Sequence, residues 1–182
     1  DREGDLWFGT ESGGLNHLDR GSGLFTYYTF EYGNPKSLSV NNIKALCQDS
    51  QGDLWIGTFN GGLNLMRHGT NHFVHYLQDP ADSTSLAIDN VLSLLEDDQG
   101  NLWVGTYGGG LDRFNLKSRK FVHLLQPYHG EGFHTIHCLI RDRRGYIWMG
   151  ANQAKIGRLD PNSGAFKSYA LNASDKNIEV KS

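Results

Sequence analysis

The stretch Gly52–Asn64, GDLWIGTFNGGLN, decides the fold because the chain repeats it three more times. Near copies begin at Gly4 (GDLWFGTESGGLN) and Gly100 (GNLWVGTYGGGLD), and a divergent copy begins at Gly145 (GYIWMGANQAKIG). The four tryptophans of the chain stand at positions 7, 55, 103 and 148, so their spacings are 48, 48 and 45 residues. A fixed period of this size indicates stacked or radially arranged units rather than one irregular domain.

Each repeat contains four short segments that are predicted to be strands. LWIGT (54–58) is apolar, brief and bounded by glycines, which is typical of a strand buried on both faces. GGLNLM (61–66) follows a tight hairpin, since the dipeptide Asn60-Gly61 tolerates positive φ. The third segment is HFVHYL (72–77), with counterparts LFTYYTF (24–30), KFVHLL (120–125) and AFKSYA (165–170). The fourth is NIKALCQD (42–49), with counterparts NVLSLLED (90–97) and TIHCLIRD (135–142).

The fourth segment ends in an aspartate three residues before a glycine, at Asp49/Gly52, Asp97/Gly100 and Asp142/Gly145. This spacing predicts a turn in which the carboxylate accepts backbone N–H bonds and the glycine takes the left-handed conformation.

A helix is the competing interpretation for one of these segments. Ile88, Val91, Leu92 and Leu95 have helical spacing, and Asp89 could cap a helix there. The apolar run is only about two turns long, however, and short helices are marginal without strong packing. We therefore predict a strand.

Four strands in 45 to 48 residues, with no helix, correspond to one blade of a β-propeller. We expect an all-β chain of four blades: 1–41, which lacks its inner strand, 42–89, 90–134, and a divergent blade with a C-terminal tail at 135–182. The segment that begins at Asn42 is predicted to be innermost in its blade. Leu54 and Ile56 should face one neighbouring blade and Trp55 the other.

Composition narrows the classes of partner. The chain has 182 residues, is 38% hydrophobic and carries a net charge of −3, so we expect no nucleic acid partner. Its longest apolar runs are a few residues, so this segment should make no membrane contact. Cys47 and Cys138 occupy non-equivalent repeat positions, and a disulfide between them is not expected.

The repeat resembles that of the two-component regulator propeller family. The similarity lies in D-x-x-G-[DN]-L-W-x-G-T-x-x-G-G-L-[ND] and in SLSVNNI (37–43) and SLAIDNV (85–91), each after a proline-containing loop. It covers essentially the whole chain and is specific in the first three units. The fourth unit departs from it, with Ala151 for threonine and Ala154-Lys155 for Gly-Gly.

The resemblance implies a function. Such propellers usually have seven blades and form the periplasmic sensor of hybrid two-component regulators in Bacteroidetes that detect complex glycans. Implied partners are therefore a glycan or other small molecule, the remaining blades and the downstream domains, which include a histidine kinase, and a second copy is a candidate partner. The sequence contains no phosphoacceptor-histidine helix or ATP-binding glycine motif. No enzymatic activity and no cofactor are expected of this segment.

Histidines suggest a metal site only weakly. The candidates are His68, His72 and His75 in one stretch and His134 and His137 in another. His72 and His75 would point to opposite faces of a strand, and we expect the position shared by His75 and His123 to be solvated surface. No metal site and no catalytic residue are predicted.

The repeated residues should hold the blades together, so ligand binding is expected where the repeats differ. The variable hairpin and the connections between blades should meet at one end of the central channel. Amide and aromatic side chains there suit a sugar. The predicted ligand-binding residues are Asn42, Asn60, Asn90, Tyr107, Tyr128, His134, Thr135 and Asn152.

Three alternatives stay open. Asn42 and Asn90 could simply satisfy backbone groups where the inner strands begin. The propeller could instead be a scaffold for protein interaction or dimerisation, and a propeller lyase or hydrolase is the third class.

Overall fold

The computed structural model describes residues 1–125, 132–152 and 155–170, which form fifteen strands in four antiparallel sheets. The first sheet has three strands, β1 (Leu6–Gly9), β2 (Leu15–Asp19) and β3 (Leu24–Tyr28). The second contains β4 (Ile43–Gln48), β5 (Leu54–Thr58), β6 (Leu63–Met66) and β7 (Phe73–Tyr76). The third contains β8 (Val91–Glu96), β9 (Asn101–Thr106), β10 (Leu111–Asn115) and β11 (Lys120–His123). The fourth contains β12 (Ile136–Arg141), β13 (Ile147–Ala151), β14 (Lys155–Leu159) and β15 (Phe166–Ala170).

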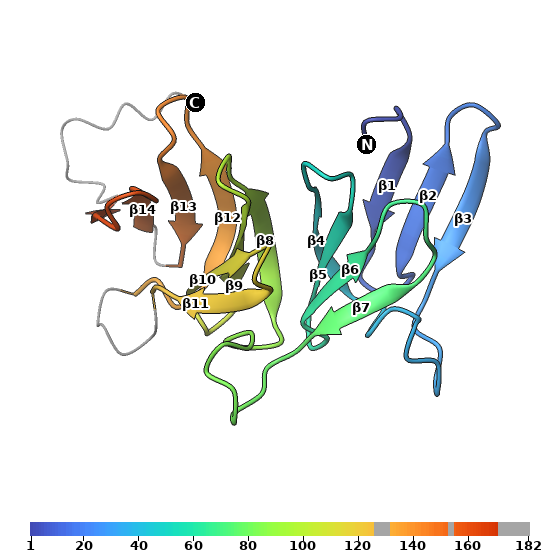
Figure 1. The fold of residues 1–182 in the computed structure, drawn as a ribbon, viewed down its shortest axis with the longest axis horizontal. Coiled ribbons are helices and arrows are strands. Elements are labelled where there is room, and N and C mark those ends of the chain that lie inside the picture. Colours follow the sequence, from blue (N-terminus) through green and yellow to red (C-terminus); the bar gives the residue numbers. More distant parts are fainter. Residues whose placement is uncertain (126–131, 153–154, 171–182) are drawn as a thin grey trace.

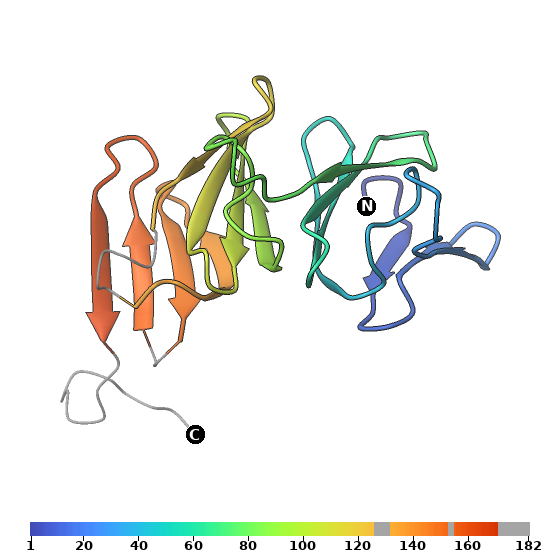
Figure 2. The same ribbon diagram turned by 90° about the horizontal axis from the view of Figure 1, so that it is seen from below.

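The sheets follow one another along the molecule, with β1–β3 at one end and the sheet of β12–β14 at the other (Figures 1 and 2). Each four-stranded sheet is a simple meander, with its strands in chain order. β4 packs beside β8, and β8 beside β12, so the first strand of each four-stranded sheet is the innermost, as predicted. The segment at 88–95 forms strand β8 and no helix. No helix in the described ranges is long and apolar enough to cross a membrane.

The hydrophobic core lies between the sheets rather than within one of them. Leu54 and Ile56 pack with Leu15 of the first sheet, whereas Trp55 packs with Phe114 of the third. This alternation confirms the predicted directions, because successive side chains of a strand point to opposite faces. Trp103 has the same role between the third and fourth sheets and is 1% exposed.

The aspartate turns are formed as predicted and have an additional bond. Asp49 Oδ1 accepts the backbone N–H groups of Gln51 (2.9 Å) and Asp53 (3.0 Å), and Gly52 has φ 88°. The other oxygen, Oδ2, accepts the indole N–H of Trp55 at 2.8 Å. The same 2.8 Å bond joins aspartate to tryptophan in the other three repeats, at Asp1/Trp7, Asp97/Trp103 and Asp142/Trp148. Each turn therefore also fixes the tryptophan that fills the next interface.

The hairpin after β5 differs in one detail from the sequence prediction. Asn60 has φ 68°, as expected, but the second left-handed residue is Gly62 (φ 66°) and not Gly61. Thr58 Oγ1 donates to the carbonyl of Gly62 at 2.8 Å, which closes the loop one residue later than the dipeptide suggested.

A bulge occurs at the same place in β4, β8 and β12, between Ile43 and Ala45, Val91 and Ser93, and Ile136 and Cys138. After the bulge, a small residue pairs with the glycine of the neighbouring strand, as Ser93 does with Gly105. A Cβ on Gly105 would lie 2.2 Å from Ser93 Oγ and 2.9 Å from Ile136 Cγ2. Glycine at this position therefore lets the inner strand of the next sheet approach closely.

Candidate functional site

The structure brings three of the predicted site residues together at the hairpin end of the sheets. Asn90 immediately precedes β8, and its backbone carbonyl accepts the N–H of Tyr107 at 2.8 Å. Its side-chain Oδ1 accepts the N–H of Asn60, in the hairpin of the preceding sheet, at 2.8 Å. Asn60, Asn90 and Tyr107 therefore lie at the same end of two adjacent inner strands.

The neighbouring repeats place further predicted residues at this end. The carbonyl of Asn42 accepts the N–H of Phe59 (2.9 Å), and that of His134 accepts the N–H of Gly108 (2.8 Å). Thr135 forms an isolated bridge with Tyr107. Asn152 Oδ1 lies 2.6 Å from His137 Nε2. Tyr128 lies outside the described residues.

The accessible part of this end is an aromatic pair. Tyr107 is 50% exposed, and its ring lies 6.0 Å from that of Phe59 in a T-shaped arrangement. The exposed Asn60 lies beside Phe59 in the same hairpin. An exposed aromatic face next to amide groups can stack on an apolar ring and exchange neutral hydrogen bonds with it. We name the surface formed by Phe59, Asn60 and Tyr107 the hairpin patch.

The predicted residues are not equally available to a ligand. Thr135 is 2% exposed, so its hydroxyl is not at the surface. The Asn90 carboxamide oxygen already accepts the backbone N–H of Asn60, as expected if Asn90 satisfies backbone groups where the inner strand begins. Asn42 Oδ1 is buried without a hydrogen-bond partner among the described residues. Of the predicted residues that the structure describes, Tyr107 and Asn60 have the most open side chains.

Three further residues at this end were not among the predicted ligand-binding residues. Phe59 packs on Tyr107, and the bulge residues Lys44 and His137 contact hairpin residues, Lys44 through Glu11 and His137 through Asn152. Lys44 Nζ forms a 2.7 Å ion pair with Glu11 of the first hairpin. The signal that could have found them is the change from Lys to Leu to His at one repeat position inside an otherwise uniform strand.

The expectation that His75 and His123 are solvated surface is wrong. His75 Nε2 lies 2.8 Å from the carbonyl of Ser37, and His123 Nδ1 lies 2.7 Å from Asp112 Oδ1. Asp112 is fully buried, and its Oδ2 accepts the N–H of Ala87 at 2.9 Å. The connections before β4 and β8 fold over this row of the sheet and leave both histidines only partly exposed.

Burial and pairing act in opposite directions on the carboxyl group of this pair. Desolvation raises the pKa of Asp112 above its ordinary value, and the hydrogen bond from His123 partly opposes that effect. The same hydrogen bond raises the pKa of His123, against the smaller effect of its own burial. Because the pair lies beneath a connection and bonds to backbone, its geometry indicates a structural role.

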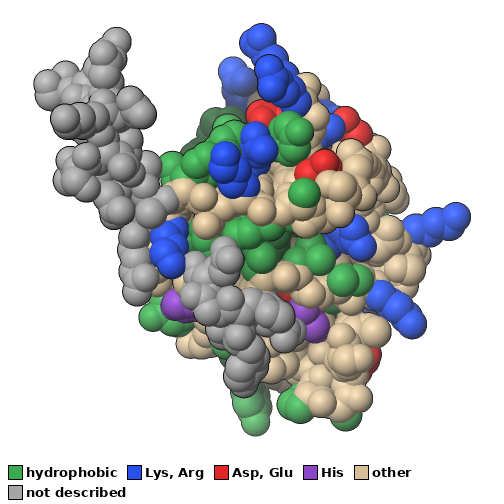
Figure 3. Space-filling view, turned by 90° about the vertical axis from the view of Figure 1, so that its left-hand side faces the viewer, with side chains coloured by type: hydrophobic (Ala, Val, Ile, Leu, Met, Phe, Trp, Pro, Cys, Tyr) green, Lys and Arg blue, Asp and Glu red, His purple; other side chains and the backbone are tan. Residues whose placement is uncertain are grey.

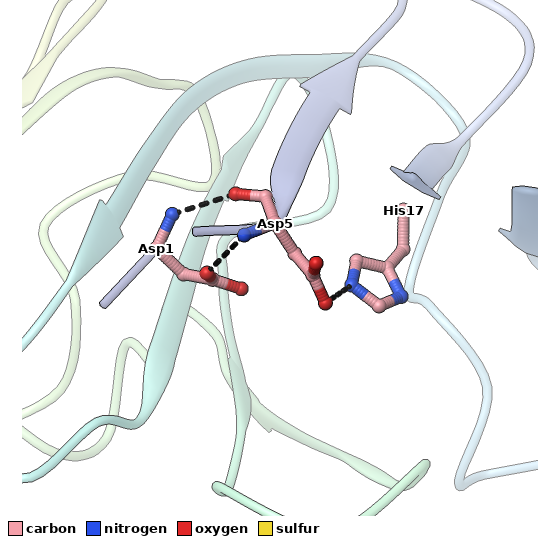
Figure 4. A group of neighbouring side chains, drawn as sticks. All are labelled: Asp1, Asp5 and His17. Carbon is pink, nitrogen blue, oxygen red and sulfur yellow. Dashed lines mark hydrogen bonds and ion pairs between the residues drawn. The ribbon is translucent and has the colours of Figure 1, made fainter. Parts of the chain in front are cut away.

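Among the described residues, one group of three side chains is close enough to hold a metal ion: Asp1, Asp5 and His17 (Figure 4). Their potential ligand atoms lie within 4.8 Å of one another. Asp1 already accepts the Trp7 indole and the Asp5 N–H, each at 2.8 Å, as the other turn aspartates do in their repeats. Asp5 Oδ2 lies 3.0 Å from His17 Nε2. The cluster is thus satisfied by protein groups, and none of the predicted histidines belongs to it.

A cavity of about 350 Å³ lies next to this cluster, between the first and second sheets. Its walls include Trp7, Tyr28, Met66 and Asn71. The equivalent place between the second and third sheets is filled, because Phe114 and Arg119 stand where Met66 and Asn71 do, and both lie against Trp55. The cavity therefore follows from smaller side chains at two repeat positions.

Comparison with known proteins agrees with the repeat pattern. The family described as two component regulator propeller matches residues 37–60, 85–108 and 130–153. Each match begins in the connection, includes the inner strand and ends in the hairpin. No curated protein matches the sequence.

Solved structures show the same architecture. The extracellular domains of the hybrid two component systems BT3049 and BT4673 from B. thetaiotaomicron are both 23% identical, with TM-scores of 0.77 and 0.73. They match 90% and 94% of this chain, which spans only 21% and 23% of their lengths. Virginiamycin B lyase from Staphylococcus aureus, 14% identical, matches 96% of this chain over 54% of its own, with a TM-score of 0.72. The chain therefore has the fold of a β-propeller segment, and three stretches of it match the two component regulator propeller family.

Proposed function

We propose that the chain is a ligand-sensing segment of an extracytoplasmic propeller in a two-component signalling receptor. The family match supports this role, and the extracellular domains of two hybrid two component systems have the same fold. In this proposal the receptor resides in the inner membrane, the segment lies in the periplasm, and a histidine kinase elsewhere in the parent protein receives the signal. Further blades and downstream domains of that protein complete the sensor.

The ligand that best fits the hairpin patch is a carbohydrate. The observation that carries this assignment is the half-exposed Tyr107 ring, supported from the side by Phe59 and flanked by the amide of Asn60. The apolar face of a sugar ring can lie on such an aromatic surface while its hydroxyl groups bond to amides. A neutral ligand is favoured because the charged groups beside the hairpins already have partners: Asp89 accepts the backbone N–H of Gln78 at 2.7 Å, and Lys44 and Glu11 are paired with each other.

The segment is proposed to bind its ligand without converting it. The described histidines with a carboxylate partner, His17 and His123, use that partner in structural contacts, and neither reaches the hairpin patch. Incubation of the chain with a glycan library should therefore leave every glycan intact. Cleavage products that disappear with a single substitution would contradict this.

Binding is tested by glycan-array screening followed by calorimetric titration of the best oligosaccharide. Tyr107→Ala should weaken binding about fivefold or more, as expected when a central interface aromatic is truncated. Asn60→Gly should also weaken binding, because glycine keeps the left-handed backbone and removes only the amide. Tyr32→Ala is the matched control, since Tyr32 is 97% exposed and lies in the connection before β4.

Asn90→Ala tests whether Asn90 binds the ligand or only satisfies a backbone group where the inner strand begins. Because Asn90 Oδ1 bonds the Asn60 N–H, we expect its loss to lower the free energy of unfolding and to leave affinity largely unchanged. Unchanged affinity in both Tyr107→Ala and Asn60→Gly would exclude the hairpin patch as the binding surface.

A further inference from the structure

The cavity of about 350 Å³ between the first and second sheets is separate from the hairpin patch. Its walls include Gly52 and residues 67–71, which belong to the turns that join β4 to β5 and β6 to β7. The hairpin that carries the patch joins β5 to β6, at the opposite end of the same strands. A ligand in the cavity would therefore leave the hairpin patch open.

One wall of the cavity is a stack of three rings from the first sheet. The ring centroid of Trp7 lies 4.1 Å from that of His17 and 6.0 Å from that of Tyr28. The opposite wall, from the second sheet, contains the buried Met66. The Tyr28 hydroxyl donates to Asn71 Oδ1 at 3.1 Å and so bridges the two walls. An apolar stem or a planar group can lie between such walls.

The equivalent place between the second and third sheets shows which groups fit there. Phe114 lies 5.3 Å from the Trp55 ring, and the guanidinium of Arg119 lies 5.6 Å from the centroid of the same ring. Between the first and second sheets the chain supplies only the slimmer Met66 and the uncharged Asn71 at these positions. Both differences lie at β6 and the turn after it, so they do not depend on the residues at either end of the chain.

A guanidinium also lies beside the tryptophan in the two later repeats. Arg158 lies over Trp148, 5.7 Å from its ring centroid. Arg113 pairs with Trp103 across two strands, and both line a cavity of about 190 Å³ between the third and fourth sheets. Trp7 instead has an imidazole beside it, and no arginine lies over its ring in the described ranges. Tryptophan is the aromatic side chain that attracts cations most strongly.

The rim of the cavity carries more negative than positive charge. Asp1, Glu3 and Asp5 contribute three carboxylates against the single guanidinium of Arg67. Asp1 and Asp5 accept hydrogen bonds from the protein (Figure 4), whereas Glu3 is exposed. The register equivalent of Glu3 in the second sheet is the neutral Gln51. The additional carboxylate thus occurs at the interface that lacks the arginine.

The charge of the whole molecule is distributed in the same sense. Residues 1–41 contain six acidic and three basic side chains, whereas residues 135–170 contain two acidic and six basic ones. Figure 3 shows the side of the molecule nearest β14, where Lys and Arg side chains lie beside hydrophobic ones. A cation is therefore attracted to the end of the molecule that holds the cavity.

We propose that this cavity binds a small organic cation of the alkylguanidinium type. The alkyl stem lies between the ring stack and Met66, and the guanidinium lies over Trp7 with N–H groups directed to Glu3. The ligand thereby takes the place that Phe114 and Arg119 fill in the next interface. The inference does not rest on the proposed sensing function, because the hairpin patch lies at the other end of the strands.

Calorimetric titration of the chain with n-butylguanidinium and with n-butylurea, its neutral isostere, tests the site. The guanidinium should bind about tenfold more tightly or better, since only the cation gains from the tryptophan ring and the carboxylates. Glu3→Gln should narrow that difference, and so should added salt. Tyr107→Ala, in the hairpin patch, should change the affinity for neither compound.

Asn71→Arg places a guanidinium of the chain itself in the cavity, as Arg119 does in the next interface. This variant should melt at a higher temperature than the parent chain and bind n-butylguanidinium about tenfold more weakly or worse. His72→Arg is the matched control, because it adds the same side chain one residue later, outside the walls of the cavity. The third sheet has the basic Lys120 at that position, and the affinity should be unchanged.

Arg119→Asn creates the same vacancy between the second and third sheets. It should lower the melting temperature, and n-butylguanidinium should restore part of the loss whereas n-butylurea should not. The proposal is overturned if the parent chain binds neither compound or binds both equally. It is also overturned if Asn71→Arg and His72→Arg bind n-butylguanidinium alike, or if Arg119→Asn responds alike to both compounds.

Discussion

The aspartate in each turn hydrogen-bonds both to the backbone of the turn and to a tryptophan of the core. Asp49, Asp97 and Asp142 each use one oxygen for two backbone N–H groups and the other for a tryptophan indole, as at Asp97, where the indole bond is 2.8 Å. A buried aspartate is costly unless its acceptors are used, and here both oxygens are used. The indole N–H, which would otherwise be buried without a partner, is satisfied by the same group. The turn and the interface therefore depend on each other.

The pair formed by the buried Asp112 and the partly exposed His123 should make stability depend on pH. Because the hydrogen bond to Asp112 raises the pKa of His123, the folded chain holds that proton more tightly than the unfolded chain. The contribution of His123 to the free energy of unfolding is complete below about pH 6.5, the ordinary pKa of histidine. It is lost as the pH rises through the raised pKa of His123 in the folded chain. Urea denaturation should show the free energy of unfolding decreasing over this range.

His123→Gln should flatten that decrease, whereas His72→Gln, at an exposed position just before β7, should leave the slope unchanged. A slope that is equal in the parent chain and in His123→Gln would show that other groups control the pH dependence.

At the scale of the element, the glycine of each second strand sets the distance between sheets. Gly105→Ala should lower the free energy of unfolding by about 1–3 kcal/mol, the usual cost of overpacking a core. The new methyl group would meet Ser93 Oγ at 2.2 Å and the Ile136 carbonyl oxygen at 3.0 Å. Thermal or urea unfolding measures the change.

Adding Ser93→Ala to Gly105→Ala should restore only part of the loss, because the Ile136 carbonyl cannot move away. Gly21→Ala is the control, since its new methyl group would have no neighbour closer than 3.2 Å. Equal losses for Gly105→Ala and Gly21→Ala would refute the close-approach explanation.

The elements could be predicted from sequence because short apolar segments at a fixed repeat spacing are framed by turn residues. LWIGT shows this best: Leu54, Trp55 and Ile56 alternate between two interfaces, and their spacing is visible in the sequence. The bulge at Lys44 could not be predicted, because it changes pairing without changing the kinds of residue present. The burial of His123 was missed for a different reason: it depends on a connection that folds over the sheet.

The candidate site was predicted less completely than the fold. Repeat equivalence was sufficient to place Asn60, Asn90 and Tyr107 at one end of the sheets. It could not show that the Asn90 amide is used by the backbone or that Phe59 supports Tyr107, since these contacts cross between repeats. Their roles in binding remain predictions.

For the whole molecule, position in the array determines how much a repeated residue contributes. Trp55 lies between two sheets and is 0% exposed, whereas the equivalent Trp148 is covered on one side only. Trp55→Ala should cost about 3–5 kcal/mol of unfolding free energy, as for other buried aromatics. Trp148→Ala should cost clearly less in dilute solution, by chemical denaturation. Similar losses would mean that the chain is not stabilised by neighbour contacts alone.

The bulge in the inner strands has an evolutionary consequence. It turns one residue per repeat out of the packing between sheets, and that position holds Lys44, Leu92 and His137, three unrelated chemistries on one scaffold. Substitutions there do not have to preserve a neighbour's shape, so single-codon changes can be accepted without compensating changes elsewhere. The chemistry at this end of the sheets can thus change while the packing between sheets is preserved.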